Sequence, residues 1–174
     1  KKDLVNALDC FEQSLSIDSL ASPGKVDSAI IYNAGLIADQ GKNYDKERFY
    51  YNRCIDIRYG GAQVFGLLAI LDKNQGDTAA YMATLERGMK VYPDDCQPLL
   101  VEVTNHYMQQ DQSDLALEYL AKAIEREPNN ASFFFAQGAM LDKLGKTDDA
   151  KVAYEKAIEI NPEHFDSWLN LGVQ

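Results

Sequence analysis

The side chains that most often carry out chemistry in proteins are few in this chain, and their spacing does not suit catalysis or metal binding. His106 and His164 have no cysteine or carboxylate arrangement around them that would hold a metal ion. Cys–His catalysis would need Cys54 or Cys96 beside a histidine and an orienting group, and no motif supplies one. The sequence therefore predicts a protein with no catalytic residues, no cofactor and no metal, whose histidines are packed or solvated.

Two further motifs allow a chemical interpretation, and each also has a structural one. The pair Gly60-Gly61 is not followed by the Lys-Ser or Lys-Thr of a phosphate-binding loop. The acidic pairs Asp94-Asp95 and Asp148-Asp149 could bind calcium or act as acid and base. Their places at the starts of predicted helices favour a second role, which is stabilisation of the positive end of the helix dipole.

The charge balance restricts the class of partner. The chain has 17 Lys and Arg residues against 27 Asp and Glu residues, which gives a net charge of -10. Such a surface repels nucleic-acid phosphates and anionic membranes, and no basic stripe offsets the repulsion. We predict no nucleic-acid partner and no membrane partner. A basic or neutral protein is electrostatically the easier partner, although an acidic surface can also serve solubility alone.

Cysteine usage and the chain ends bear on the compartment. Cys10, Cys54 and Cys96 are too widely spaced for a disulfide framework or a zinc motif, which favours a reducing compartment such as the cytoplasm. The sequence has no signal peptide and no apolar run near the ~20 residues of a membrane span. It opens on Lys1 without Met and stops at Gln174 partway through a helical pattern, so we expect a fragment of a longer protein.

An internal period of the sequence predicts the helices that would position any binding surface. Several independent columns of apolar or small residues share a spacing of 34 residues: Leu100, Phe134 and Trp168; Ala116 and Ala150; Ala123 and Ala157; Pro128 and Pro162. A shared period in several columns indicates a repeat array. In such an array each unit buries its core only against its neighbours.

Each repeat has the pattern of two helices joined by a short turn. Two runs with helical spacing occur in the range 131–164: Phe134, Gly138 and Leu141, then Ala150, Tyr154 and Ala157. Gly145 can take the positive φ that ends the first helix, and the pair Asn161-Pro162 ends the second. We expect the small residues to let the two helices approach closely. The larger residues are expected to fill the space toward the next hairpin.

These residues resemble the tetratricopeptide repeat (TPR) family. The likeness rests on seven positions of 131–164 and on the start of a further copy: Phe134, Gly138, Leu141, Ala150, Tyr154, Ala157 and Pro162, then Trp168, Leu171 and Gly172. The range 97–130 matches with Thr104 in place of the usual glycine. The earlier copies match more loosely, because Glu47 and Tyr81 replace the usual alanine and Tyr59 replaces the usual proline.

The resemblance implies an all-α fold, a right-handed α-α superhelix (solenoid) of stacked antiparallel helix hairpins. It implies one array over 1–174, divided as follows: the second helix of a truncated repeat at 1–18, repeats at 28–61, 62–96, 97–130 and 131–164, and the start of a further truncated repeat at 165–174. Between the first two elements, Ser22-Pro23-Gly24 predicts a longer loop.

In this family the first helix of each hairpin lines a concave face that binds extended peptides or helices. The resemblance places ten candidate partner-binding residues there: Tyr32, Asn33, Leu36, Leu67, Ile70, Val101, Asn105, Met108, Phe135 and Leu169. Their apolar character predicts a groove for a peptide or helix. Two alternatives are that a tight superhelix buries these residues against one another, and that flanking segments fill the groove.

One subgroup of the family binds the C-terminal carboxylate of chaperones through paired Lys and Asn residues. The matching places in this chain hold no cation: Tyr32, Leu36, Leu67, Pro98 and Glu102. Because a carboxylate needs a positive partner, the resemblance does not extend to that activity.

The sequence thus predicts a non-catalytic protein–protein interaction scaffold. Phe49, Tyr50 and Tyr51 are consecutive, so one of them should be exposed, either packed on a neighbouring helix or in contact with a partner. Two other functions stay open. One is a regulatory or substrate-presenting domain of a larger enzyme. The other is a self-association module whose exposed terminal half hairpins dock onto another copy.

Overall fold

The computed structural model describes residues 2–21 and 27–173, and the loop predicted around Ser22-Pro23-Gly24 lies outside these ranges. The described residues form ten α-helices and no strand, which confirms the predicted all-α class. The helices are α1 (Lys2–Ala21), α2 (Ser28–Gln40), α3 (Tyr44–Asp56), α4 (Gly61–Asn74), α5 (Thr78–Val91), α6 (Gln97–Gln109), α7 (Ser113–Arg126), α8 (Ala131–Lys143), α9 (Thr147–Ile160) and α10 (Phe165–Val173).

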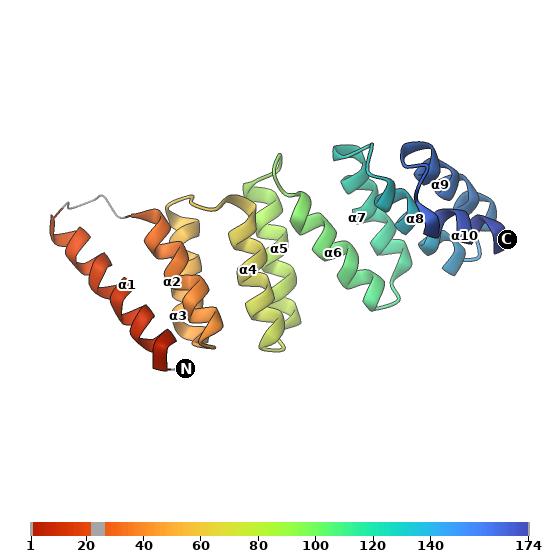
Figure 1. Cartoon of the computed structure of the whole chain (residues 1–174). Coiled ribbons are helices and arrows are strands. Elements are labelled where there is room, and N and C mark those ends of the chain that lie inside the picture. The colour runs from red at the N-terminus through yellow and green to blue at the C-terminus, as the bar shows by residue number, and fades with distance from the viewer. Residues whose placement is uncertain (1, 22–26, 174) are drawn as a thin grey trace. The chain divides into compact units, whose positions relative to one another are not determined.

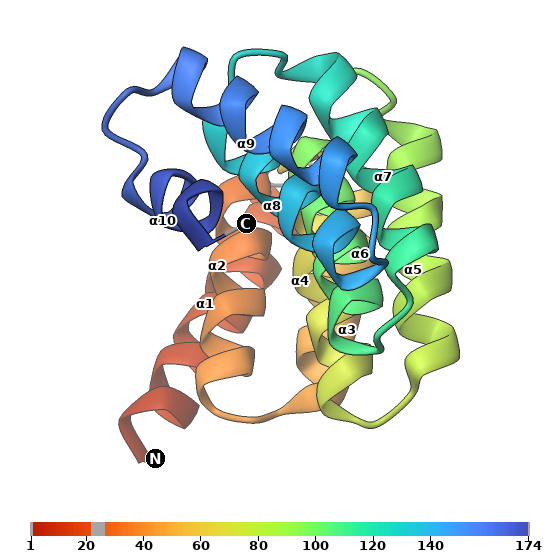
Figure 2. The same cartoon turned by 90° about the vertical axis from the view of Figure 1, so that its right-hand side faces the viewer.

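The helices are grouped into two compact units, Lys1–Leu99 and Leu100–Gln174. In the first unit α1 packs on α2, α2 on α3, α3 on α4 and α4 on α5 (Figure 1). In the second unit α7 packs on α8, α8 on α9 and α9 on α10, so that α8 lies between α7 and α9 (Figure 2). These helices thus contact their neighbours in the chain, as expected for stacked hairpins.

Polar side chains fix where several helices begin. Asp27 accepts a hydrogen bond from the Ala29 N–H at 2.9 Å, and Asp77 accepts one from the Ala80 N–H at 2.9 Å. Asn130 accepts from the Ser132 N–H at 3.2 Å. These side chains satisfy backbone donors that have no partner inside the first turn.

The turn inside each hairpin has the same backbone conformation in all four cases. Four residues that share one register have positive φ: Lys42 (55°), Gly76 (79°), Asp111 (57°) and Gly145 (72°). The residue after each of them donates its N–H to a carbonyl five residues earlier, for example Lys146 to Leu141 at 2.9 Å. This pattern closes the first helix with a left-handed residue. The conformation predicted for Gly145 is confirmed, and at two of the four places a residue with a side chain adopts it.

The two helices of a hairpin approach closely where glycine faces tyrosine. A Cβ atom on Gly138 would lie 2.5 Å from the Tyr154 ring, and one on Gly35 would lie 2.6 Å from the Tyr51 ring. Ala150 and Ala157, which lie on α9 with Tyr154, are fully buried. Glycine therefore lets the two helices of a hairpin approach closely, as the sequence predicted. The Tyr154 ring, expected to fill the space toward the next hairpin, instead packs on Gly138 within its own hairpin.

Residues that depart from the repeat pattern are nevertheless buried. Tyr81 is 1% exposed and Glu47 is 3% exposed, although both stand where alanine is usual. Of the three consecutive aromatic residues, Tyr50 and Tyr51 are buried and Phe49 is 57% exposed. The Tyr50 hydroxyl donates to Glu12 at 2.9 Å, and Lys46 pairs with the same carboxylate at 2.6 Å, so α3 holds α1 in place.

Candidate functional site

Five of the predicted binding residues lie in the first unit. Tyr32, Asn33 and Leu36 belong to α2, and Leu67 and Ile70 belong to α4. Asn33 and Ile70 are exposed and the other three are half-buried. Tyr32 and Leu67 both pack against the core that α1 to α4 share, so the structure brings these two helices to a common core. The Tyr32 ring also meets the Tyr59 ring edge-on at 6.0 Å between centroids.

The other five predicted residues lie in the second unit. Val101, Asn105 and Met108 belong to α6, Phe135 to α8 and Leu169 to α10. Asn105 and Leu169 are exposed, and the remaining three are half-buried. Met108 packs against the core formed by Ala116, Leu120 and Met140. In each unit we call the predicted binding residues of the first helices the first-helix face; they are half-buried apolar side chains with exposed neighbours.

Phe135 also packs against His164. The two rings lie 5.1 Å apart between centroids, and Phe135 lies 5.9 Å from Tyr154. The His164 Nδ1 is 3.0 Å from the Ser167 Oγ at the start of α10. His164 is therefore a packed residue that helps begin a helix. Among the described residues no group of three His, Cys, Asp or Glu side chains could hold a metal ion.

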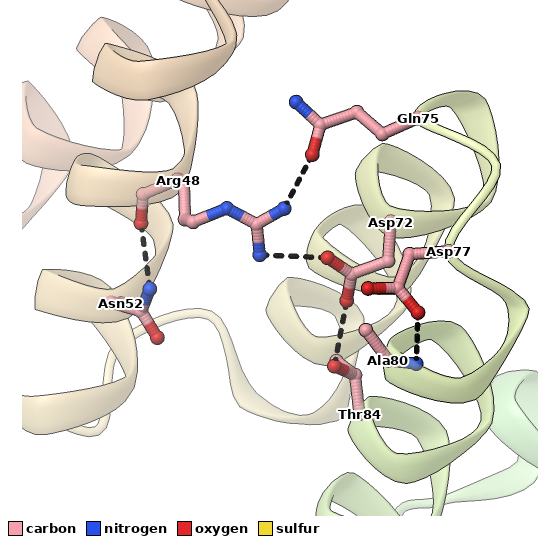
Figure 3. Close-up of polar contacts among 7 residues, drawn as sticks. All are labelled: Arg48, Asn52, Asp72, Gln75, Asp77, Ala80 and Thr84. Atoms are coloured by element: carbon pink, nitrogen blue, oxygen red, sulfur yellow. Dashed lines mark hydrogen bonds and ion pairs between the residues drawn. The ribbon is translucent and has the colours of Figure 1, made fainter.

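A second feature, absent from the sequence prediction, joins α3 to α4 and α5 of the next hairpin in the first unit (Figure 3). Asp72 of α4 is 1% exposed, and its Oδ1 pairs with the Arg48 Nη1 of α3 at 2.7 Å. Its Oδ2 accepts from the Thr84 hydroxyl of α5 at 2.9 Å. The Arg48 Nη2 donates to the Gln75 Oε1 at 2.8 Å. A buried carboxylate needs such partners, because an unpaired buried charge is strongly destabilising.

The corresponding region of the second unit is a cleft. The volume of this cleft is about 540 Å³. Seven residues of α8 and α9 line it: Phe134, Gln137, Leu141, Asp149, Val152, Ala153 and Lys156. We call it the α8/α9 cleft. Phe134 and Leu141 are only half-buried and Val152 is 65% exposed. The prediction that Phe134 and Leu141 fill the space toward the next hairpin is therefore incomplete, because one side of both residues faces this cleft.

One signal in the sequence could have located the ion pair of Asp72. Asp72 stands in the repeat column that holds Tyr107 and Leu141, so a charged residue replaces a large apolar one. A buried charge in an apolar column requires a charged or hydrogen-bonding partner. The identity of that partner could not be read from the repeat pattern, because Arg48 belongs to a different copy.

Glu47 is the most perturbed carboxyl group among the described residues. Burial and the charge of Asp39, partly opposed by Arg48, raise the pKa of Glu47 to about 7. Its Oε2 and the Tyr51 hydroxyl are both buried without a hydrogen-bond partner in the described part of the chain. Glu47 is therefore partly protonated near neutral pH, which reduces the cost of burying it.

Tyr154 and Cys54 are both held in their neutral forms at neutral pH. Burial and the hydrogen bond to Asp142, 2.8 Å away, raise the pKa of Tyr154 to about 12. Burial raises the pKa of Cys54 to about 11, so this thiol is not a nucleophile at neutral pH. Cys54 is fully buried in the core of the first unit and stands in the repeat column that holds Ala123 and Ala157.

Comparison with known family profiles identifies the repeat family of the chain. One tetratricopeptide repeat profile matches residues 131–164, and a second matches residues 28–59 and 106–130. Together they cover about half of the chain, and the chain belongs to the tetratricopeptide repeat family. The fold class predicted from the sequence, a superhelix of stacked hairpins, is that of this family. Its members are protein-interaction scaffolds, and that is the class of protein defined by the fold.

Similar proteins differ widely in their overall roles. The chain is 24% identical over 148 residues to human Protein O-mannosyl-transferase TMTC1, which covers 83% of this chain and 16% of that protein. It is 23% identical over 173 residues to Anaphase-promoting complex subunit 3 of Schizosaccharomyces pombe, covering 98% of this chain and 24% of that protein. The chain thus spans less than a quarter of the length of these curated relatives.

Among solved structures, the chain is similar to YrrB, which is described as a TPR protein with an unusual peptide-binding site. The TM-score is 0.64 at 19% identity, and the match covers 97% of this chain and 83% of that chain. At this identity the likeness shows the fold alone. No helix in the described residues is long and apolar enough to cross a membrane.

Proposed function

We propose that this chain binds a peptide or an amphipathic helix of a partner protein on its first-helix faces. The observation that carries the proposal is apolar exposure on these faces. Ile70 of α4 is 45% exposed and Leu169 of α10 is 53% exposed, beside half-buried side chains such as Leu67 and Phe135. Apolar surface of this kind can be covered by the apolar side of a helix or by alternate side chains of an extended peptide.

The polar residues of the same faces suit a backbone ligand. Asn33 in the first unit and Asn105 in the second are exposed, and each amide offers both donors and an acceptor. A peptide backbone has the complementary groups, so these amides would fix its orientation while apolar neighbours supply affinity. The proposed site consists of Tyr32, Asn33, Leu36, Leu67 and Ile70 in the first unit, and Val101, Asn105, Met108, Phe135 and Leu169 in the second.

The partner is a neutral or basic protein segment, because the net charge of the chain is -10. The same charge disfavours nucleic acids and anionic lipid surfaces, which we exclude as partners in this proposal. We place its action in a reducing compartment such as the cytoplasm, where three free cysteines persist. The chain itself has no catalytic role in this proposal.

The proposal is tested by capturing partners from the native source with three versions of the full chain and quantifying them by mass spectrometry. The test variant carries Ile70→Asp and Leu169→Asp. The control variant carries Val91→Asp and Leu115→Asp, which are 47% and 41% exposed and lie on second helices. We expect the test variant to lose specific partners about tenfold while the control retains them. Equal recovery with both variants would contradict the proposal.

A second candidate function is a regulatory or substrate-presenting domain within a larger enzyme. The observation in its favour is that one relative, human Protein O-mannosyl-transferase TMTC1, is named as a mannosyl-transferase, and that the match covers 16% of that protein. The test uses the full-length gene product of this chain with Ile70→Asp and Leu169→Asp. A raised KM for a protein acceptor with unchanged kcat would support a substrate-presenting role, whereas unchanged kinetics would exclude it.

Self-association is a third candidate, favoured by the exposed side chains of α10. Phe165 is 72% exposed and Trp168 is 54% exposed. A second copy could cover them through its own terminal helix. Sedimentation equilibrium across protein concentrations tests this candidate, with Trp168→Ala as the variant expected to weaken the association. A monomer at all concentrations would exclude it.

A further inference from the structure

The hairpins α4/α5 and α8/α9 can be compared residue by residue, because equivalent places are 69 residues apart. Phe65 corresponds to Phe134, and Asp72 corresponds to Leu141. The helix bounds agree with this register, since α5 begins at Thr78 and α9 begins at Thr147. The two hairpins thus share their helix bounds and can be compared by the side chains at equivalent places.

In the first unit, long basic side chains of the chain itself cover this region. The Arg87 guanidinium lies over the Phe65 ring at 5.4 Å from its centroid, and Phe65 is fully buried. Arg48 of the preceding second helix reaches Asp72 at 2.7 Å. Two arginines thus occupy the place that is the α8/α9 cleft in the second unit.

In the second unit neither arginine is present. Leu117 stands at the place of Arg48, and Lys156 stands at the place of Arg87. Lys156 lines the α8/α9 cleft, and its Nζ donates to the Glu159 Oε2 at 2.8 Å, so its charge is paired within α9. The Phe134 ring is only half-buried as a result, and about 540 Å³ stays open beside it. This volume is within the usual range of ligand sites.

We propose that the α8/α9 cleft binds an arginine side chain of a partner protein together with its apolar neighbours, on a surface separate from the first-helix faces. The partner's guanidinium stacks on the Phe134 ring, as Arg87 stacks on Phe65. The Asp149 carboxylate lines the same cleft and pairs with the guanidinium. Apolar side chains next to the arginine cover Leu141 and Val152.

Charge complementarity favours this occupant over a neutral or acidic one. Residues 100–174 contain 13 Asp and Glu residues against 6 Lys and Arg residues. A cation approaching this unit is therefore attracted from a distance, and an anionic segment is repelled. Arginine suits the cleft better than lysine, because its planar group can both stack on a ring and form a two-point contact with a carboxylate.

The test uses the full chain and a set of acetylated, amidated peptides of leucine and alanine that carry one arginine at each position in turn. Each peptide has a twin in which citrulline replaces arginine, which keeps the shape and removes the charge. Methyl NMR signals of Leu141 and Val152 report occupancy of the cleft. We expect saturable shifts with a Kd below about 1 mM for at least one arginine peptide, and affinity about tenfold weaker for its citrulline twin.

Two variants separate the cleft from other surfaces. Val152→Lys places a cation in the cleft at a residue that is 65% exposed, and Ala83→Lys makes the same change at the equivalent exposed place in the first unit. Val152→Lys should abolish binding and Ala83→Lys should leave it unchanged. Asp149→Asn should weaken binding of the arginine peptide toward that of its citrulline twin.

Three results would overturn the inference: no saturable shift with any peptide, equal affinity for the citrulline twin, or shifts confined to methyl groups of the first-helix faces. The last of these would support the proposed function while rejecting the cleft as a site. Failure of the cleft and failure of the first-helix faces are therefore distinguishable in one set of spectra.

Discussion

The hairpins α4/α5 and α8/α9 have the same helices, the same turn and the same left-handed residue, yet one surface is closed and the other is open. In the first unit a buried Asp72 is joined to Arg48 and Thr84, and Phe65 lies beneath Arg87. In the second unit leucines replace Asp72 and Arg48, and a cleft of about 540 Å³ is left beside Phe134. The repeat backbone thus specifies where a groove lies, and a few side chains specify whether it is filled.

The largest expected effect comes from breaking the ion pair that closes the first unit. Asp72 is 1% exposed, and Arg48→Ala removes the cation that pairs with its carboxylate. We expect the free energy of unfolding to fall by about 3 kcal/mol. Urea unfolding followed by circular dichroism measures the change.

A double variant tests whether the ion pair, and not the volume of Arg48, causes this loss. Arg48→Leu combined with Asp72→Leu installs the residues that stand at Leu117 and Leu141 in the second unit. Its stability should lie within about 1 kcal/mol of the unaltered chain, because an apolar pair can replace a buried ion pair. A double variant as unstable as Arg48→Ala would show that the comparison between the two hairpins is misleading.

The next effect concerns Glu47, whose equivalent in α7 is the fully buried Ala116. Because the pKa of Glu47 is raised from 4.5 to about 7 in the folded chain, the unfolded chain loses this proton first as pH rises. The free energy of unfolding should therefore fall through this group by about 2 kcal/mol between about pH 5 and pH 8.

Glu47→Gln removes the titration while keeping the size of the side chain. The variant should match the unaltered chain near pH 5 and exceed its stability near pH 8, as measured by urea unfolding at each pH. The difference between the two proteins isolates Glu47 from the histidines, which titrate in both. Parallel stability curves for the two proteins would reject this account of the buried carboxyl group.

A smaller effect separates two helical glycines. Gly138→Ala would place a Cβ 2.5 Å from the Tyr154 ring, and we expect a loss of ~1–2 kcal/mol. Gly66→Ala in α4 would meet no atom nearer than 3.6 Å, so the usual gain of ~0.5–1 kcal/mol for alanine in a helix should appear. Thermal melts of both variants measure the contrast, and a loss in both would argue against the close approach of α8 and α9 as the cause.

The smallest effect tests the equivalence of the four turns. Lys42 has φ 55° at the place where Gly76 and Gly145 stand in other hairpins. Lys42→Gly should relieve this conformation and stabilise the chain by up to ~1 kcal/mol. The same change at the exposed Lys90, in the last turn of α5, should destabilise the chain slightly, because glycine weakens a helix. If both changes destabilise equally, the left-handed turn at Lys42 carries no strain.

Much of the fold could be predicted from particular residues. The spacing of Phe134, Gly138 and Leu141 predicted α8, and Gly145 predicted where the next helix would be separated from it. The pair Asn161-Pro162 predicted the end of α9, which is at Ile160. These signals are local, because helix periodicity and turn chemistry act within a few residues.

The candidate sites were predicted less completely. The first-helix residues came from a resemblance and stay a prediction as a binding surface. The ion pair of Arg48 with Asp72 and the α8/α9 cleft were not predicted. Both depend on which side chains meet after hairpins stack, and a repeat column does not contain that information.

The sequence by itself determined the helical hairpins, their period and the places of close approach, because each depends on residue types at fixed local spacing. The tertiary structure alone decided that two arginines close one surface of the first unit and that its counterpart in the second unit stays open. The physical reason is that closure depends on long side chains from separate helices, whose attraction to a buried carboxylate or an aromatic ring acts only once packing has brought them within a few ångströms.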